Sequence, residues 1–198
     1  MRRSAVVFVG LLGLAVACGS PTSLTAVWKA PGVTGVRFQK ILVAAQDKDQ
    51  ARRRNMEAFL VKRLQNATPS YELLSEAEAR DTARAKAKIV TGGFDGAVVI
   101  RFVGTRDRQT HTPGASYWGV APYGTMWGFW GYGWGAVYDP GYMTNDTLVA
   151  LESNVYSVSR DELIWSSQSE TVNPGSVNKL MQSMVDATAR EMRKQKVI

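Results

Sequence analysis

The hydrophobic pattern of the chain predicts several strands. Compact apolar runs at 38–45 and 97–103 have the length and composition of buried strands, and the second is the more apolar of the two. Residues 146–158 alternate between apolar and polar side chains, and 163–171 follow after a short polar turn, which predicts an antiparallel hairpin. A further short strand is expected at 71–74.

Three segments have apolar residues at helical spacing. The first, 50–66, follows Asp47 and Asp49, whose short side chains can accept hydrogen bonds from the free N–H groups of a helix start. The second begins at Ser75, which forms a capping-box pattern with Glu78, and is expected to run to about residue 90, before two glycines.

The third helix is expected to start at Asn173-Pro174. Its apolar residues form one stripe at spacings of three, four and seven, which is typical of a core-facing helix: Val177, Leu180, Met181, Met184, Val185, Thr188 and Met192. Strands joined by helices should be parallel, and the late hairpin should be antiparallel. The sequence therefore predicts a single α/β (α+β-like) domain, in which about three helices cover a mixed sheet.

The first residues have the pattern of an export signal. Arg2 and Arg3 precede an apolar stretch at 5–16 that is too short to span a bilayer comfortably. Leu14-Ala15-Val16-Ala17-Cys18 resembles the lipobox of bacterial lipoproteins, which implies lipid, palmitate included, on Cys18 and removal of the signal. The expected organisation is a signal peptide at 1–17, a lipidated tether at 18–35 and an α/β domain at 36–198.

The cysteine content and the net charge are consistent with export and lipid attachment. Cys18 is the only cysteine, so the mature chain has no internal disulfide, and acylation would remove the free thiol. By the same resemblance, Gly19 in place of an aspartate indicates the outer membrane, facing the periplasm, rather than the inner membrane. The net charge is +7, and +5 without Arg2 and Arg3. Export argues against nucleic acid as the partner, which leaves a basic face toward anionic lipid or cell-wall polymers, or a merely solvated surface.

The region 117–142 combines aromatic residues with glycines, inside an insertion expected at 112–143. No charged residue occurs between His111 and Tyr138, but the glycine content disfavours a transmembrane helix. The segment is therefore a hairpin packed on the sheet, a loop that faces lipid or a partner, or a mobile low-complexity loop. Exposed aromatic side chains imply a partner, and the candidate binding residues are Trp118, Tyr123, Trp127, Trp130, Tyr132, Trp134 and Tyr138.

No catalytic set is apparent in the sequence. His111 is the only histidine and lacks companion ligands for zinc, and no Gly-x-Ser-x-Gly motif occurs. Asp95 and Asp146 lie near predicted strand ends, where sites of α/β folds often form. We expect no catalytic residue, no metal and no cofactor, with a hydrolase that uses one of these two acids as an alternative.

Several short blocks resemble a family of uncharacterised bacterial lipoproteins. The blocks are Val27-Trp28-Lys29, 38–43, Gly93-Phe94-Asp95-Gly96, Gly141-Tyr142, Asn145-Asp146-Thr147, 163–166 and Pro174-Gly175-Ser176. The resemblance implies an envelope lipoprotein without known catalysis. The sequence thus predicts a non-enzymatic scaffold or binding module, held on a membrane by its lipid, whose partner is an envelope protein, lipid or glycan. A peptidoglycan-binding module is a further alternative.

Overall fold

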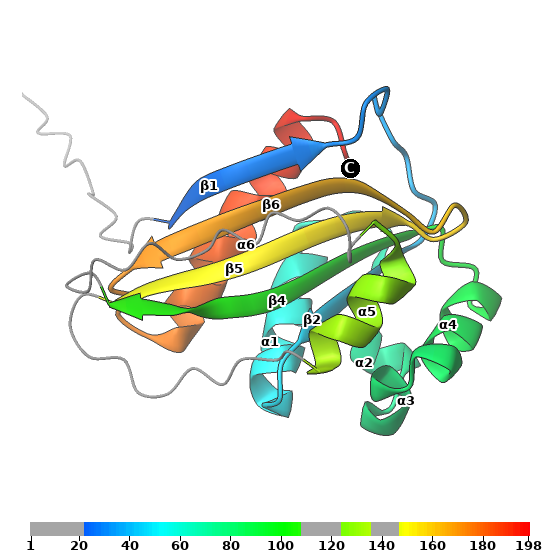
Figure 1. Cartoon of the computed structure of the whole chain (residues 1–198), viewed down its shortest axis with the longest axis horizontal. Coiled ribbons are helices and arrows are strands. Elements are labelled where there is room, and N and C mark those ends of the chain that lie inside the picture. Colours follow the sequence, from blue (N-terminus) through cyan, green and yellow to red (C-terminus); the bar gives the residue numbers. More distant parts are fainter. Residues whose placement is uncertain (1–21, 108–123, 136–146) are drawn as a thin grey trace, which may run out of the picture.

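One six-stranded sheet with helices on both faces forms the body of the protein (Figure 1). The structure is a computed structural model that describes residues 22–107, 124–135 and 147–198. In chain order its elements are β1 (Thr22–Lys29), β2 (Ile41–Gln46), α1 (Gln50–Val61), β3 (Ala67–Pro69), α2 (Ser70–Leu73), α3 (Glu76–Arg80), α4 (Thr82–Thr91), β4 (Gly96–Asp107), α5 (Met126–Gly135), β5 (Thr147–Ser157), β6 (Glu162–Val172) and α6 (Val177–Lys194).

The sheet is mixed, with the strand order β1-β6-β5-β4-β2-β3. β2 pairs in parallel with β3 and β4, whereas β4, β5, β6 and β1 pair antiparallel. The predicted fold class, the parallel early strands and the antiparallel hairpin are confirmed. β4 has the central place that its apolar sequence indicates, because a strand covered on both faces must be apolar on both.

The alternation along β4 separates two cores. Val98 and Ile100 belong to the core beneath α1 and α6, and Ala97 and Val99 belong to the core beneath α3, α4 and α5. The stripe of α6 is buried as expected except for Val177, which is 39% exposed in the first turn. α6 begins three residues later than Pro174, because Ser176 is its N-cap.

Capping residues fix the helix boundaries. Asp49 accepts hydrogen bonds from the first N–H groups of α1, and Ser75 forms the predicted capping box with Glu78. The single helix expected after Ser75 is instead two, because Asp81 ends α3 and its side chain caps α4. The expected glycine stop is present, with Gly93 at a φ of +72°.

The strand expected at 71–74 is a wrong prediction. Residues 71–74 are not a strand: the edge strand is β3, and α2 follows it directly. Pro69 explains why the strand ends before residue 71. Proline suits an edge strand, and Pro69 is itself extended at the N-cap position of α2. Within the expected tether at 18–35, Thr22–Lys29 forms β1, which pairs with the serine-rich strand β6.

Candidate functional site

The aromatic-glycine segment contributes a helix to the core. α5 places Met126, Phe129 and Trp130 at helical spacing, and all three side chains are 0% exposed. The Trp130 indole N–H donates to the Ala79 carbonyl at 2.9 Å, and Gln46 Nε2 donates to the Trp130 carbonyl at 3.1 Å. Trp130 therefore belongs to the core, and its assignment to an exposed binding loop is wrong.

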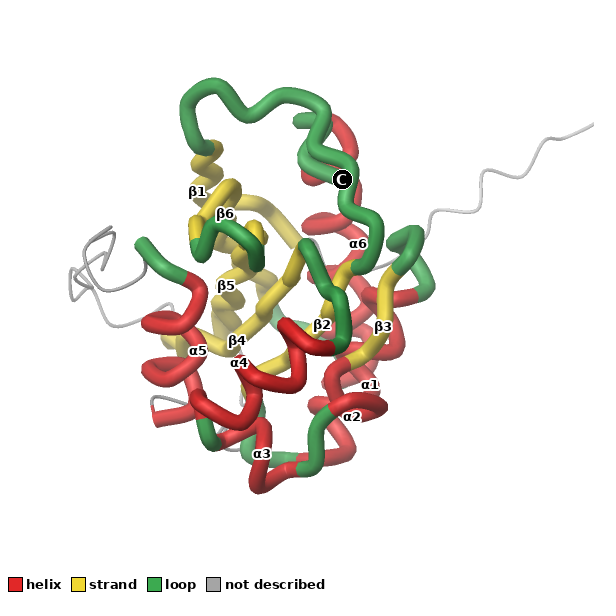
Figure 2. Tube along the Cα trace, turned by 90° about the vertical axis from the view of Figure 1, so that its right-hand side faces the viewer, coloured by secondary structure: helices red, strands yellow, loops and turns green. Residues whose placement is uncertain are grey.

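Close packing explains part of the glycine content of α5. A Cβ built on Gly131 would lie 3.2 Å from the Thr82 hydroxyl, at the start of α4. A Cβ at this position would require the Thr82 side chain to shift by a few tenths of an ångström, so glycine suits this close approach. Figure 2 shows α5 beside α4. The sequence did not reveal this helix, because low helix propensity argued against one.

The other candidate binding residues are only partly described. Trp127 is half-buried, with the Lys86 ammonium 5.0 Å from its ring centre, and its backbone N–H donates to Asp161 at 3.3 Å. Tyr132 and Trp134 lie on α5, but their side chains are outside the described part. Outside the described residues altogether are Cys18, Trp118, Tyr123 and Tyr138, together with His111 and Asp146.

The attachment points of the aromatic segment lie at the same end of the sheet as Thr22. The strand register places Thr22 opposite Thr171, Thr171 opposite Val149, and Val149 opposite Thr105. Three strand spacings, about 14 Å, therefore separate Thr22 from Thr105. We call this the anchor end, because Thr22 is four residues after Cys18. In Figure 1 it is the end where β1 begins and β4 ends.

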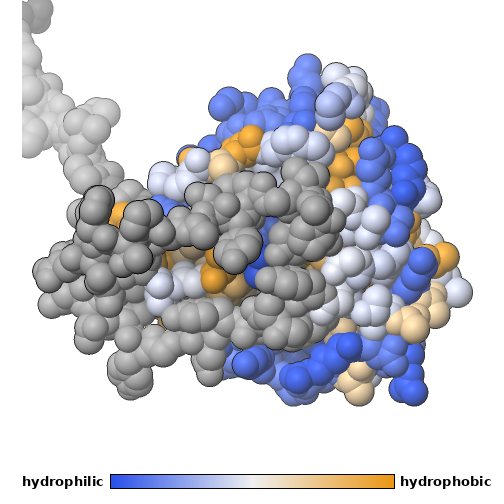
Figure 3. Space-filling view, in the orientation of Figure 1, coloured by the Kyte–Doolittle hydropathy of each residue, from blue (hydrophilic) through white to orange (hydrophobic). Residues whose placement is uncertain are grey.

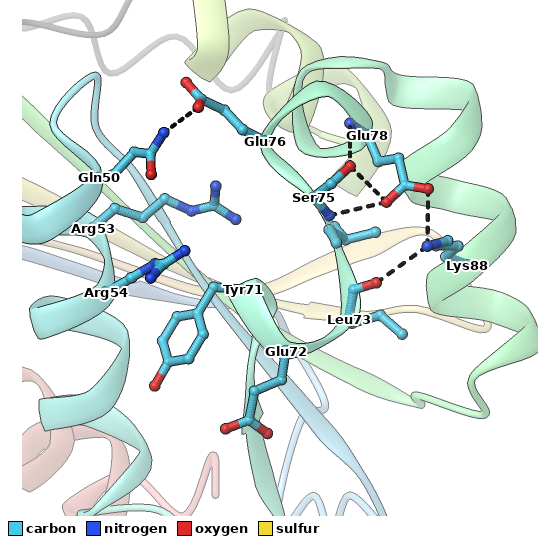
Figure 4. Close-up of a pocket in the computed structure, with 11 residues that line it drawn as sticks. Gln50, Arg53, Arg54, Tyr71, Glu72, Leu73, Ser75, Glu76, Glu78 and Lys88 are labelled. Carbon is cyan, nitrogen blue, oxygen red and sulfur yellow. Dashed lines mark hydrogen bonds and ion pairs between the residues drawn. The ribbon is translucent and has the colours of Figure 1, made fainter.

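A groove of about 310 Å³ lies between the first turns of α1 and the region from α2 to α4 (Figure 4). Cationic, acidic and neutral polar side chains share its walls, so it has no single sign of charge. Its lining residues are Gln50, Arg53, Arg54, Tyr71, Glu72, Leu73, Leu74, Ser75, Glu76, Glu78 and Lys88.

A buried network holds one wall of the groove. Glu57 accepts hydrogen bonds from the Arg53 guanidinium at 3.1 Å, the Ser70 hydroxyl at 2.7 Å and the Ala45 amide at 3.0 Å. Burial raises the pKa of the Glu57 carboxyl, and the nearby Arg53 charge acts in the opposite direction. The network joins α1 to β2 and α2, which is a structural task.

The opposite wall contains a hydroxyl beside a carboxylate. The Ser75 hydroxyl donates to Glu78 at 2.8 Å, and Lys88 forms an ion pair with Glu78 at 2.9 Å. These hydrogen bonds lower the pKa of the Glu78 carboxyl to about 2. A general base works best with a pKa near the operating pH, so Glu78 is a poor base, and the pair serves as the cap of α3.

Asp95, the acid of the hydrolase alternative, is engaged with the backbone. Its carboxylate oxygens accept hydrogen bonds from the amides of Gln39 at 2.8 Å and Lys40 at 2.9 Å. This arrangement fixes the chain as it enters β2 beside β4. Both carboxylate oxygens of Asp95 thus already accept hydrogen bonds from the backbone.

The described residues contain neither a cluster of metal ligands nor a helix suited to span a membrane. Within 22–107, 124–135 and 147–198, no group of three or more His, Cys, Asp or Glu side chains is placed to hold a metal ion. In the same ranges, no helix combines the length and apolar character that crossing a membrane requires.

No family model and no curated protein matches the chain. Solved structures with a similar backbone include two of the PelC dodecamer from Paraburkholderia phytofirmans. The first, of a leucine-to-methionine variant, has 10% sequence identity and a TM-score of 0.47, and the match covers 83% of this chain and 95% of that chain. The second has 9% sequence identity and a TM-score of 0.45, and the match covers 85% of this chain and 97% of that chain. Lipoprotein GNA1162 from Neisseria meningitidis has 15% identity and a TM-score of 0.38 over 78% and 98%. At these identities the similarity is one of backbone course alone.

Proposed function

We propose that the protein is a lipid-anchored lipoprotein of the bacterial cell envelope that acts as a non-enzymatic binding module. The observation that carries the proposal is the short distance along the chain between the lipobox and the folded domain. Four residues from Cys18 to Thr22 reach at most about 14 Å, so lipid on Cys18 would hold the anchor end close to the membrane. Two or three acyl chains anchor a protein durably.

The aromatic segment is the proposed contact element at this end. Its chain leaves the sheet after Asp107 and returns at Thr147, which are paired with one another. Trp and Tyr side chains favour the membrane–water interface and also stack on sugars or proteins. Since Trp130 is in the core, the proposal concerns Trp118, Tyr123 and Tyr138, with an envelope protein, lipid or glycan next to the membrane as partner.

The chemistry of the groove supports a binding role over a catalytic one. Glu78 is engaged with Ser75 and Lys88, and Glu57 accepts bonds from Arg53 and Ser70. Groups that are saturated by structural bonds are poor acids, bases and nucleophiles.

Metabolic labelling with a clickable palmitate analogue tests the anchor. The wild-type protein should take up the label, and Cys18→Ala should not. A matched control combines Cys18→Ala with Ser159→Cys, which restores one cysteine in an exposed turn that has no lipobox pattern before it, and it should stay unlabelled. Equal labelling of wild type and Cys18→Ala would refute the proposed anchor.

Co-sedimentation tests the contact element. The double variant Trp118→Ala/Tyr138→Ala should bind purified peptidoglycan or phospholipid vesicles less than wild type. Trp28→Ala is the control, because Trp28 is 38% exposed on β1 and is not in the segment. The contact role is wrong if the double variant and the control sediment like wild type with both materials.

We further propose that the lipid on Cys18 lies in the outer membrane rather than in the inner membrane. Gly19→Asp should move the labelled protein toward the inner-membrane fraction of a density gradient, since Gly19 stands where an aspartate would favour retention. An unchanged distribution would contradict this assignment.

A further inference from the structure

Cationic side chains gather where β1, α1 and α6 end, away from the anchor end. Figure 2 views the molecule from this side, with the C-terminus toward the viewer. The acids among them are Asp186 and Glu191, so positive charge is in excess. We call this surface the basic pole, and it consists of Lys29, Lys62, Arg63, Arg190, Arg193, Lys194 and Lys196.

Direct contacts join these residues into one surface. Arg193 donates to the Arg63 carbonyl at 2.9 Å, which connects the ends of α6 and α1. The Lys29 ammonium donates to the Gln195 carbonyl at 3.4 Å, which connects the end of β1. Residues four apart share a helix face, so Arg190 lies beside Lys194 on α6.

The two acids neutralise only part of the basic pole. Asp186 forms an ion pair with Arg63, and Glu191 forms one with Lys194 at 3.3 Å. Within the described part of the chain, no carboxylate lies within ion-pair distance of Lys62, Arg190 or Lys196, all three of which are exposed.

Helix capping explains only a few of these charges. Cations in the last turn of a helix interact favourably with its dipole, and Arg193 and Lys194 have that position on α6. Further cations within a Debye length, about 10 Å at moderate salt, repel one another. An anionic partner would relieve this repulsion.

The location of the basic pole decides the kind of anion. α6 has 18 residues and is therefore about 27 Å long, and Thr22 contacts Ser183 in its first half. The proposed lipid at Cys18 thus holds the opposite end of the domain near the membrane. The basic pole then points away from the lipid headgroups of that membrane.

We propose that the basic pole binds an acidic glycan, a polysaccharide that carries carboxylates, beyond the membrane surface. This inference rests on the proposed envelope location, which also removes nucleic acid as a partner. A linear polyanion fits better than a small anion, because the charges are spread over two helix ends and one strand. Each exposed cation then interacts with a separate carboxylate along the polymer.

Binding to polygalacturonate tests the proposal on the full protein purified from membranes in nonionic detergent. We expect binding that weakens as NaCl is raised, because salt screens such contacts. The triple variant Lys62→Gln/Arg190→Gln/Lys196→Gln should weaken it by about 100-fold, at about fivefold per cation beside an anionic surface.

The matched control removes three exposed cations elsewhere. Lys48→Gln/Arg84→Gln/Lys179→Gln has the same net charge as the test variant, and its residues lie near the starts of α1, α4 and α6. The affinity of this control for polygalacturonate should stay within about threefold of that of the wild-type protein. Removing three distant cations weakens the long-range attraction by about as much as the loss of one cation at the binding surface. Far-ultraviolet circular dichroism would confirm that both triple variants are folded.

Three outcomes would overturn the proposal. Equal loss in the two triple variants would mean attraction by net charge alone. Undetectable binding of the wild-type protein to polygalacturonate would exclude the glycan. Binding to phosphatidylglycerol vesicles without binding to polygalacturonate would assign the basic pole to lipid. Binding to polygalacturonate does not depend on acylation. The binding can therefore be absent while Cys18 is labelled, and it can be present while Cys18 is unlabelled, so the two proposals fail separately.

Discussion

Replacing Trp130 with alanine should strongly destabilise the domain. The side chain is 0% exposed, and an aromatic side chain of this kind buries about 150–250 Å². At about 25 cal/mol per Å² this corresponds to about 4–6 kcal/mol, an upper estimate because unfolded chains already bury some surface. Core Trp→Ala changes cost about 3–5 kcal/mol. We therefore expect a loss of about 4 kcal/mol in the free energy of unfolding.

Two companion variants separate packing from hydrogen bonding. Trp130→Phe keeps most of the ring contact but leaves the Ala79 carbonyl without its 2.9 Å donor, so about 1–3 kcal/mol should be lost. Trp127→Ala removes a half-buried ring and a cation–π contact with Lys86, and it should lose less than about 2 kcal/mol.

Urea unfolding followed by far-ultraviolet circular dichroism measures these losses without relying on tryptophan fluorescence. The order of stability should be wild type, Trp127→Ala, and then Trp130→Ala. If Trp130→Ala unfolds at the same urea concentration as the wild-type protein, α5 is not part of the core. The alternative from the sequence, a loop that faces lipid or a partner, would then be favoured.

The remaining predictions concern a glycine of β4 and the capping box of α3. A Cβ on Gly96 would lie 2.4 Å from the Phe38 ring, so Gly96→Ala should cost about 1–3 kcal/mol in urea unfolding. Gly104→Ala in the same strand meets nothing within 4 Å and should cost less than about 0.5 kcal/mol; equal costs would contradict the contact. Because the pKa of Glu78 is about 2 in the folded protein and 4.5 ordinarily, its contribution is present above pH 4.5 and is lost as pH falls toward 2. Glu78→Gln keeps a capping amide but should show a shallower loss of stability in this pH range, and an unchanged pH profile would refute the ion pair with Lys88.

The hydrophobic pattern was sufficient for the four inner strands of the sheet, β2, β4, β5 and β6. The runs that became β2 and β4 are apolar on both faces, and the alternation in β5 assigns Val149 and Leu151 to the core beneath α6. Local capping signals were equally reliable, as Asp49 and Ser75 show, because they depend only on nearby residues.

The missed elements depend on contacts between distant residues. β1 is stabilised by pairing with β6, and its own sequence has little periodicity. α5 has poor helix formers, and it is helical because Met126, Phe129 and Trp130 fill a core against α4 and the sheet. Propensity is a weak guide where tertiary packing decides. The groove likewise joins α1 with α2 to α4, which no local pattern could place together.

The candidate site was only partly predictable for the same reason. The lipobox is a local pattern, so the sequence could identify Cys18 as the proposed attachment point. Exposure of an aromatic residue is set by the fold, and the sequence could not distinguish Trp130 in the core from Trp127 at its margin. The basic pole needed the structure, because Lys29 and Lys62 come from elements far from α6 in the sequence.

Lipid on Cys18 is proposed to hold the anchor end at a membrane. The most direct test is the intact mass of the mature protein purified from membranes, measured beside the Cys18→Ala variant. We expect a chain that begins at Cys18 and carries the added mass of two or three acyl groups, and no such mass in the variant. An unacylated mature chain of the wild-type protein would contradict the anchor and the orientation derived from it.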